Sequence, residues 1–309
     1  YDSGYRRIRH SSPQTIVDEI KRAKSKQPHL STVNFHDDSF LALPYKQLED
    51  FAKLYKQEVK IPFAVGGVIP NYVREDKIAL LVDAGMNRVR MGIQSGSDNI
   101  LQFYKRPTKL HRIKEATEIL NKFDKYMIPP SYDIILENPV EKIEDTRATV
   151  DMIYEMPRPF TLNVYALRVI PNTIMAKQIE DRGLKVPPID KNYYVDYRRT
   201  LGNILVFVLT IWKIPRWLYK ILRKRVYPVQ DKQPSYPILF WIVRMIYLAK
   251  RAFNHLRFMD FSLLPGKIGH ILWKLRIISF WQRFIVKHYH LPQQEYNNLS
   301  ETSENSKNI

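Results

Sequence analysis

Polar side chains that could bind a ligand or move protons follow three strand-like segments of the sequence. These groups are His36-Asp37-Asp38, Gln94-Ser95-Gly96-Ser97, and Glu137-Asn138-Pro139, the last preceded by Asp133 within its strand. In α/β architectures with parallel strands, ligands bind at the carboxyl ends of the strands. We therefore expect carboxylates, an amide and hydroxyls to converge on one rim, where they could hold a polar ligand or perform acid–base chemistry.

Each group also has a simpler interpretation. Asp37 and Asp38 could cap the following helix, the Gln94–Ser97 segment could be an ordinary strand-to-helix turn, and Asp133 could be the partner of a buried basic residue. The chain has no GxxxxGK[ST] or GxGxxG motif. This argues against binding of nucleoside triphosphates or dinucleotides through those loops.

The segments that must position these groups alternate between strand-like and helical patterns, with a period of roughly 25 to 30 residues. Such alternation predicts parallel strands joined by crossover helices. Ser12-Pro13 is typical of a helix start. The expected strands cover 32–36, 61–65, 87–93, 131–136 and 161–167, and the main helices between them cover 45–58, 74–84, 98–104, 109–123 and 143–155.

Seven short motifs occur in an order that resembles the radical S-adenosylmethionine (SAM) superfamily. Within it, they resemble the class whose members usually carry an upstream cobalamin-binding domain. The motifs are Arg6–Pro13 leading into Val17–Ile20, Phe35–Phe40, Asp83–Gly85, Met91–Ser97, Tyr104–Arg106, Tyr132–Pro139 followed by Glu144-Asp145, and Pro171–Thr173. The resemblance covers more than half of the chain.

The resemblance implies an α/β fold, a partial (β/α)6 TIM-like barrel that here lacks its first strand. A mostly helical, basic C-terminal region follows it. In this superfamily, three cysteines bind a [4Fe–4S] cluster that reductively cleaves SAM to a radical. The chain contains no cysteine, so we expect the cluster ligands upstream of Tyr1, lost by truncation, and expect this chain alone to be inactive. The class further implies cobalamin on an upstream domain and a reductant such as flavodoxin or ferredoxin.

The same resemblance assigns charged residues to the methionine part of SAM. It places Asp37 and Asp38 beside the amino group, because a carboxylate binds an ammonium through charge-assisted hydrogen bonds. Arg106 is the corresponding candidate for the charge of the methionine carboxylate.

The polar uncharged candidates are assigned to the rest of the cofactor. Gln94, Ser95 and Ser97 would approach the ribose and the methionine carboxylate with amide and hydroxyl groups. Asn138 and the strand around Ile135 would line the adenine side. Many members of the superfamily carry Glu where this chain has Gln94, and glutamine keeps the same hydrogen-bonding reach.

Three functions remain open from the sequence. The first is a radical SAM enzyme that methylates, cyclises or rearranges an unknown, lipid-like substrate. The second is a protein without a cluster that binds SAM or a partner and serves as a membrane-attached scaffold. The third is a TIM-barrel hydrolase or aldolase, for which His36, Asp37 and Asp38 are the only candidate constellation.

The C-terminal part of the chain differs in composition from the part that resembles a barrel. The whole chain has a formal charge of +18, and residues 201–290 hold 16 Lys or Arg against 2 Asp or Glu. This segment also contains all five tryptophans, Trp212, Trp217, Trp241, Trp273 and Trp281. Short apolar runs with cations and tryptophans are typical of segments that bind anionic lipid surfaces. Packing onto the barrel or onto a missing domain, or binding to nucleic acid, are the alternatives.

These observations predict three regions. Residues 1–185 form the barrel, residues 186–290 form a helical region on the membrane surface, and residues 291–309 form a disordered tail because few of them are apolar. We expect the protein in the cytoplasm, peripheral at the inner face of the membrane. Its expected partners are the substrate, the reductant and anionic lipid.

Overall fold

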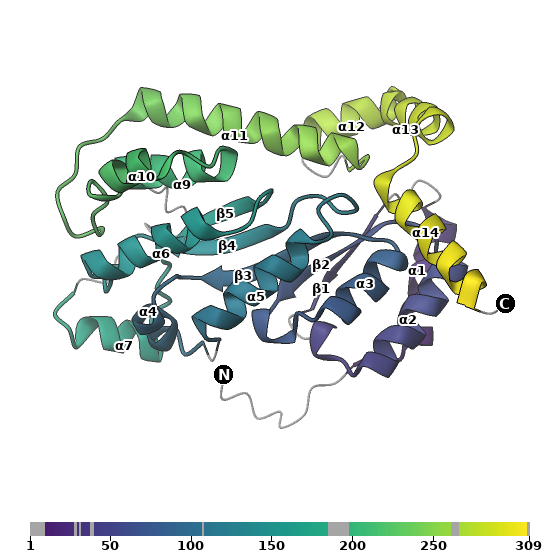
Figure 1. Cartoon of the computed structure of the whole chain (residues 1–309), viewed down its shortest axis with the longest axis horizontal. Helices are drawn as coiled ribbons and strands as arrows, with labels where there is room; N and C mark the ends of the chain where they lie inside the picture. The colour runs from purple at the N-terminus through teal and green to yellow at the C-terminus, as the bar shows by residue number, and fades with distance from the viewer. Residues whose placement is uncertain are drawn as a thin grey trace. The chain divides into compact units, whose positions relative to one another are not determined.

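The computed structural model contains five parallel strands in sequential order, as the sequence predicts. It describes residues 10–27, 30, 32–37, 40–106, 108–184, 198–260 and 266–307. The strands are β1 (Val33–His36), β2 (Phe63–Val68), β3 (Met86–Gln94), β4 (Ser131–Leu136) and β5 (Thr161–Ala166), in one sheet of order β1-β2-β3-β4-β5 (Figure 1). The alternation of these strands with helices confirms the predicted α/β fold of the partial-barrel type.

Helices follow each strand, and a helical region ends the chain. In the first part they are α1 (Pro13–Lys26), α2 (Tyr45–Glu58), α3 (Glu75–Asp83), α4 (Asp98–Phe103), α5 (Leu110–Asn121), α6 (Ile143–Glu155) and α7 (Ile174–Glu180). The C-terminal helices are α9 (Leu201–Ile211), α10 (Arg216–Arg223), α11 (Pro237–Arg257), α12 (Gly266–Lys274), α13 (Ile277–His288) and α14 (Pro292–Lys307). The side chain of Ser12 accepts a hydrogen bond of 3.1 Å from the amide of Thr15, so α1 starts at the predicted N-cap.

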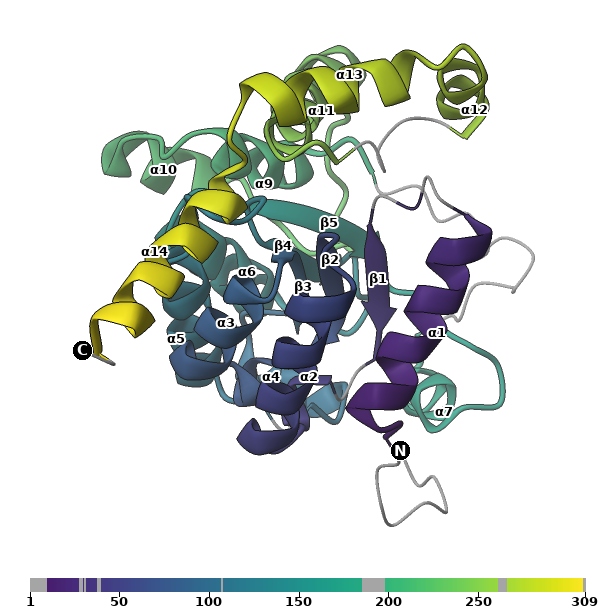
Figure 2. The ribbon, with the colours of Figure 1, turned by 90° about the vertical axis from the view of Figure 1, so that its right-hand side faces the viewer.

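The chain forms two compact units, each with its own core. Unit 1 comprises residues 1–91, 119–130 and 252–309. There, α1, α2 and α3 lie side by side along β1 and β2 (Figure 2). Phe35, Phe51, Tyr55 and Phe63 pack with ring centroids 4.7 to 6.4 Å apart. These rings, of which those of Phe51, Tyr55 and Phe63 are fully buried, join the helices to the strands.

Unit 2 comprises residues 92–118 and 131–251. Its strands β4 and β5 pair in register from Ser131 with Thr161 to Leu136 with Ala166. A second core lies under the C-terminal helices, where Phe207 of α9 contacts Phe240 and Tyr247 of α11. The hydroxyl of Tyr247 donates a hydrogen bond of 2.6 Å to the carbonyl of Leu162. Helix α9, part of the predicted membrane-surface region, is therefore a core helix of this unit.

The last helix corrects the prediction of a disordered tail. Residues 292–307 form α14, and its side chains contact unit 1. Gln293 donates a hydrogen bond to the carbonyl of Val82, and the ring of Tyr296 lies 4.7 Å from that of Tyr126. The low apolar content hid this helix because a few residues on one face are enough to attach it. The predicted boundary between residues 185 and 186 lies outside the described residues.

The C-terminal helices differ in how far they are covered. Within the described part of the chain, no helix is both long enough and apolar enough to cross a membrane. Phe207 on α9 is fully buried, whereas Phe280 on α13 is 62 % exposed.

We expect Phe207→Ala to lower the free energy of unfolding by about 3–5 kcal/mol, because it leaves a cavity in the core of unit 2. Phe280→Ala is the matched control and should change it by less than about 0.5 kcal/mol. Urea denaturation followed by circular dichroism measures both. Equal effects of the two substitutions would contradict a core position for α9.

Candidate functional site

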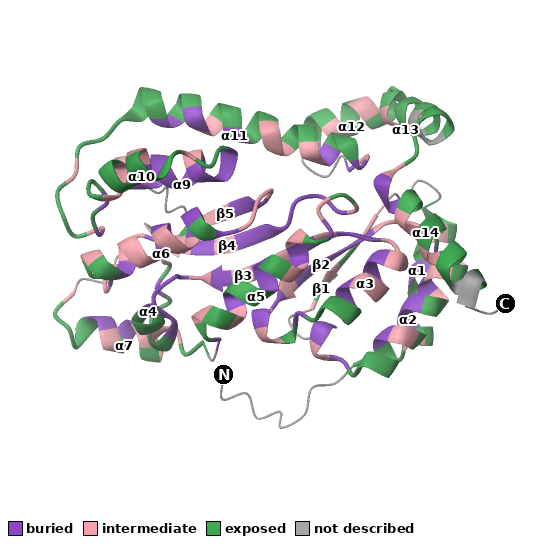
Figure 3. Ribbon diagram, viewed as in Figure 1, coloured by how far each residue is buried: buried purple, intermediate pink, exposed green. Residues whose placement is uncertain are grey.

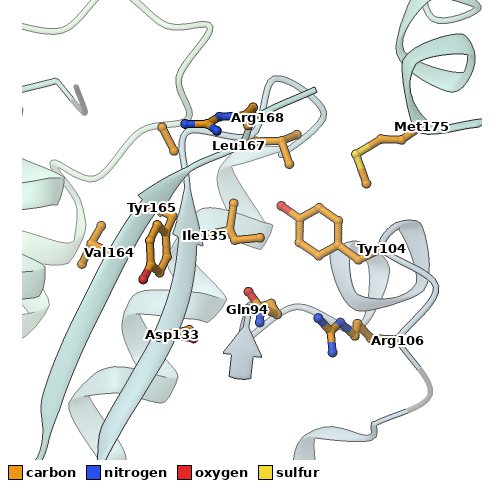
Figure 4. Close-up of a pocket in the computed structure, with 11 residues that line it drawn as sticks. Gln94, Tyr104, Arg106, Asp133, Ile135, Val164, Tyr165, Leu167, Arg168 and Met175 are labelled. Carbon is orange, nitrogen blue, oxygen red and sulfur yellow. The ribbon is translucent and has the colours of Figure 1, made fainter. Parts of the chain in front are cut away.

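A cavity of about 580 Å³ opens at the carboxyl ends of the strands of unit 2. Charged, amide and hydroxyl groups meet aliphatic side chains in its wall (Figure 4). The lining residues are Gln94, Tyr104, Arg106, Asp133, Ile135, Val164, Tyr165, Ala166, Leu167, Arg168 and Met175. A volume of this size and a mixed lining are typical of small-molecule sites.

The register of β4 and β5 explains why one wall carries polar groups. Asp133 pairs with Asn163, and Ile135 pairs with Tyr165, so these four side chains share one face of the strands. Nδ2 of Asn163 donates a hydrogen bond of 2.8 Å to Oδ1 of Asp133. Oδ1 of Asn163 in turn accepts one of 3.0 Å from Arg251. The arginine therefore reaches Asp133 through Asn163, which refines the interpretation of Asp133 as the partner of a basic residue.

Gln94 ends β3 in a backbone conformation that its residue type rarely adopts. Its φ is +73°, in the left-handed region that glycine adopts at no steric cost. A Cβ atom on Gly92 would lie 2.7 Å from Nε2 of Gln94, so the absence of a side chain at Gly92 leaves room for the amide. Figure 4 shows this amide at the end of β3, directed into the cavity. Strained residues of this kind cluster at ligand sites.

Tyr104 and Arg106 form the wall opposite β5, directly after α4. The hydroxyl of Tyr104 accepts a hydrogen bond of 3.0 Å from Nδ2 of Asn138, and Oδ1 of Asn138 accepts one of 2.9 Å from the amide of Val140. Burial raises the pKa of Tyr104 above its ordinary value, so the phenol stays protonated and can donate. Asn138 is fully buried and does not line the cavity. It holds Tyr104 there.

Ser95 and Ser97 are directed into the fold rather than into the cavity. Oγ of Ser95 shares a hydrogen bond of 3.0 Å with Oγ1 of Thr149, and Oγ of Ser97 donates one of 2.5 Å to Asp145. Both serines are buried. A Cβ atom on Gly96, between them, would lie 2.7 Å from the backbone of α6. The serines therefore fasten the turn after β3 to α6, which differs from the expected contact with the cofactor.

Asp37 is not among the residues that line this cavity. Asp37 is half-buried after β1 in unit 1, and Asp38 lies outside the described residues. Of the six predicted site residues that the structure describes, Gln94 and Arg106 line the cavity. In the part of the chain that the structure describes, no group of three His, Asp or Glu could hold a metal ion.

Tyr165, Arg168 and Met175 line the cavity although the sequence analysis did not select them. For two of them, the sequence contains a pattern that could have identified them. Tyr165 lies two residues after Asn163 in the strand predicted over 161–167, and Arg168 follows the end of that strand directly. The rule applied to the other strands, that ligand groups follow the carboxyl end, would have found Arg168. Nothing in the sequence pattern marked Met175.

A sequence profile of the Radical SAM superfamily matches residues 1–153 of this chain. This segment belongs to the Radical SAM superfamily. It includes β1 to β4 and α6, so the radical SAM match extends through the turn that carries Gln94 and through Tyr104 and Arg106. The remainder of the cavity, from Val164 to Met175, lies beyond the matched segment.

Curated relatives match about half of the chain. An anaerobic coproporphyrinogen III oxidase of Cereibacter sphaeroides is 25 % identical over 152 residues, which make up 49 % of this chain and 31 % of that protein. The heme chaperone HemW of Bacillus subtilis is 22 % identical over 184 residues, 57 % of this chain and 46 % of that protein. The chain thus spans less than half the length of these relatives.

Among solved structures, the apo form of OxsB, described as a cobalamin-dependent SAM radical enzyme, matches 100 % of this chain and 53 % of its own. The sequence identity is 14 % and the TM-score is 0.52. This is a likeness of fold, and it extends over the C-terminal helices as well as the radical SAM segment.

Glu141 is a buried acid with few hydrogen bonds to offset the cost of its burial. Its Oε2 accepts a hydrogen bond of 3.2 Å from Thr146, and its Oε1 has no partner within the described residues. Burial raises the pKa of Glu141 from its ordinary value of 4.5 to about 8, and the nearby charge of Asp145 adds to the increase. The folded state therefore holds a proton that the unfolded state releases above pH 4.5.

This difference in pKa predicts that the contribution of the Glu141 proton to stability is fully present below pH 4.5 and is lost as the pH rises through about 8. Glu141→Gln removes the titrating group, so its unfolding free energy relative to the unmodified protein should rise by more than about 1 kcal/mol between pH 5 and pH 8. Urea denaturation at several pH values measures the difference. Glu118→Gln, at a side chain 54 % exposed, is the control. A constant difference for Glu141→Gln would contradict the raised pKa.

Proposed function

We propose that the chain is the C-terminal part of a radical SAM enzyme and that the cavity of unit 2 binds SAM. The observation that carries the proposal is the position of Gln94. Its backbone is strained at the end of β3, and its side-chain amide is directed into a cavity of about 580 Å³ that Arg106 also lines. The volume lies in the range of sites for small ligands. The lining also offers both charged groups and aliphatic side chains, which matches a molecule with a charged amino-acid end and a flat base.

The residues of this chain would bind and orient the cofactor. Arg106 and Arg168 are cations at the rim that suit the carboxylate of the methionine part. Gln94 and the protonated phenol of Tyr104 supply hydrogen bonds, and Ile135 offers an apolar surface beside them. Asp37 does not line the cavity and Asp38 lies outside the described residues, so their proposed contact with the amino group rests on the family resemblance alone. Ser95, Ser97 and Asn138 support the proposal as residues that hold the wall in place.

The iron–sulfur cluster does not fit the residues of this chain, because the chain has no cysteine. We place its three thiolates upstream of Tyr1. Bound there, such a cluster would supply the electron for the reductive cleavage of SAM. A flavodoxin or ferredoxin is the proposed source of that electron. We further propose that an upstream domain binds cobalamin, because the order of the motifs resembles the cobalamin-associated class.

The reactions of the resembled class are methylation, cyclisation or rearrangement of an unactivated carbon skeleton, and the proposed membrane location favours a lipid-like substrate. We propose a lipid-like substrate and a cytoplasmic, peripheral location. The alternative, a SAM-binding scaffold without a cluster, uses the same cavity, so cavity residues do not separate the two. Anaerobic cluster reconstitution of the protein from its complete reading frame does. Formation of 5′-deoxyadenosine supports the enzyme, and SAM binding without cleavage favours the scaffold.

Gln94→Gly is the sharpest test of SAM binding at this cavity. Glycine removes the amide and accepts φ +73° without strain. We therefore expect stability to be kept or slightly raised while the affinity for SAM falls by roughly tenfold or more, the effect of losing a hydrogen bond to a charged ligand. Calorimetry with the reconstituted protein measures the affinity, and thermal denaturation measures the stability.

Arg106→Ala should weaken SAM binding by a similar factor. Lys114→Ala on α5, 77 % exposed and outside the cavity, is the control. Unchanged affinity in both the Gln94 and Arg106 variants would refute the assignment of this cavity to SAM. Loss of affinity in the Lys114 variant would show that the measurement reports a general effect.

A further inference from the structure

Helices α12 and α13 form a segment that is held at both ends within unit 1. At its start, Oδ2 of Asp260 lies 2.5 Å from Nη1 of Arg88 and 3.2 Å from Nδ1 of His255. At its end, α14 is attached through Gln293 and Tyr296, as described above. Residues on both sides of the two helices are therefore attached to other parts of unit 1.

The described side chains of this segment are not covered. From residue 267 to residue 290, none of them is buried (Figure 3). Large apolar side chains are among the exposed ones: Leu275 is 63 % exposed, Ile271 54 % and Trp281 49 %. Ile268, Ile271 and Leu275 recur at helical spacing, as do Ile277, Trp281 and Phe284. Such repeats predict an apolar stripe on each helix, and stripes of this size on a protein surface mark an interaction site.

The cations of the segment decide which partner suits it. Residues 266–288 contain Lys267, Lys274, Arg276, Arg283 and Lys287, and no Asp or Glu. Among the described residues, no ion pair joins Lys267, Lys274, Arg276 or Lys287 to an acid. A second copy of the chain, facing this surface with its own, would bring like charges together. An anionic partner is favoured instead.

Helix α11 is basic and partly exposed as well, but its cations serve the fold. The guanidinium of Arg244 lies 4.8 Å from the ring of Phe207, and Nζ of Lys250 donates a hydrogen bond of 2.8 Å to the carbonyl of Ile211. Arg251 donates to Asn163. These three cations of α11 are therefore used within the fold, in contrast to the cations of α12 and α13.

We propose that α12 and α13 lie on an anionic lipid surface, with the stripes inserted among the acyl chains and the cations on the lipid phosphates. Trp273 and Trp281, exposed on the two helices, suit the headgroup depth that tryptophan prefers. The arrangement is that of an interfacial helix pair, which lies in the plane of the membrane. This inference is independent of SAM binding.

Vesicle flotation with the full chain tests the inference. We expect binding to vesicles of phosphatidylcholine with 30 mol % phosphatidylglycerol, and at least tenfold weaker binding to phosphatidylcholine alone. Raising the salt concentration should weaken the binding, because salt screens the electrostatic part. Equal binding to both vesicles, or none to either, would overturn the inference.

Two variants of exposed side chains separate the contributions. Trp281→Ala/Phe284→Ala should reduce binding at least tenfold, and Lys267→Glu/Lys274→Glu should reduce it by about 25-fold or more, since each cation near the surface contributes about fivefold. Tyr45→Ala/Tyr72→Ala, two exposed aromatics elsewhere in unit 1, is the matched control and should bind normally.

Circular dichroism and sedimentation of each variant accompany the flotation. Unchanged vesicle binding in both α12–α13 variants, each with an intact spectrum, would overturn the role of these helices. A different result would assign the stripes to a second copy of the chain. In that case the unmodified chain would form a dimer and would not bind vesicles, and the Trp281→Ala/Phe284→Ala variant would be a monomer. Flotation and calorimetry use different variants, so failure of one proposal leaves the other intact.

Discussion

The turn after β3 fixes the direction of the chain on which the candidate site depends. Its backbone touches α6 at Gly96, where a side chain would collide with the helix, and the hydroxyls of Ser95 and Ser97 bind Thr149 and Asp145 of the same helix. Because both ends of the turn are bonded, the chain leaves β3 in one direction only, and α4 then delivers Tyr104 and Arg106 to the cavity. Buried polar networks are stable when every member is satisfied, and this one connects the core to the site.

Two residues with strained backbone lie at the ends of the central strands. Gln94 at the end of β3 and Glu137 directly after β4 both have positive φ, at +73° and +58°. Glu137 offsets this cost with hydrogen bonds of 2.7 Å from the amide of Arg198 and 2.8 Å from Asn203. The amide of Gln94 is instead directed into the cavity. The same backbone conformation thus has two roles. At Glu137, after β4, it helps to attach the C-terminal helices, and at Gln94, at the end of β3, it forms part of the cavity wall.

Local patterns predicted most of the fold, because alternation and helix caps are encoded within a few residues. The helices 45–58 and 143–155 and the strand 131–136 match the structure at both ends. The site was harder to predict, because a motif names residues without saying where their side chains point. Ser95 and Ser97 belong to the motif but face α6, whereas Tyr165 and Arg168 face the cavity from a strand that no motif marked. Helix α14 was missed because its attachment depends on partners distant in the sequence, Val82 and Tyr126.

The close contact at Gly96 also limits how such a domain can diversify. A side chain at this position would meet backbone atoms of Ala148 and Thr149 at 2.7 Å, and backbone cannot move aside as a flexible side chain can. Insertions and substitutions in the turn would therefore disturb α6 before they altered the cavity. The wall formed by Arg168 and Met175 follows β5, and residues 166–175 contain no glycine in such a close contact with backbone. Changes in ligand preference between related proteins would then arise on that wall, while the turn after β3 stays constant.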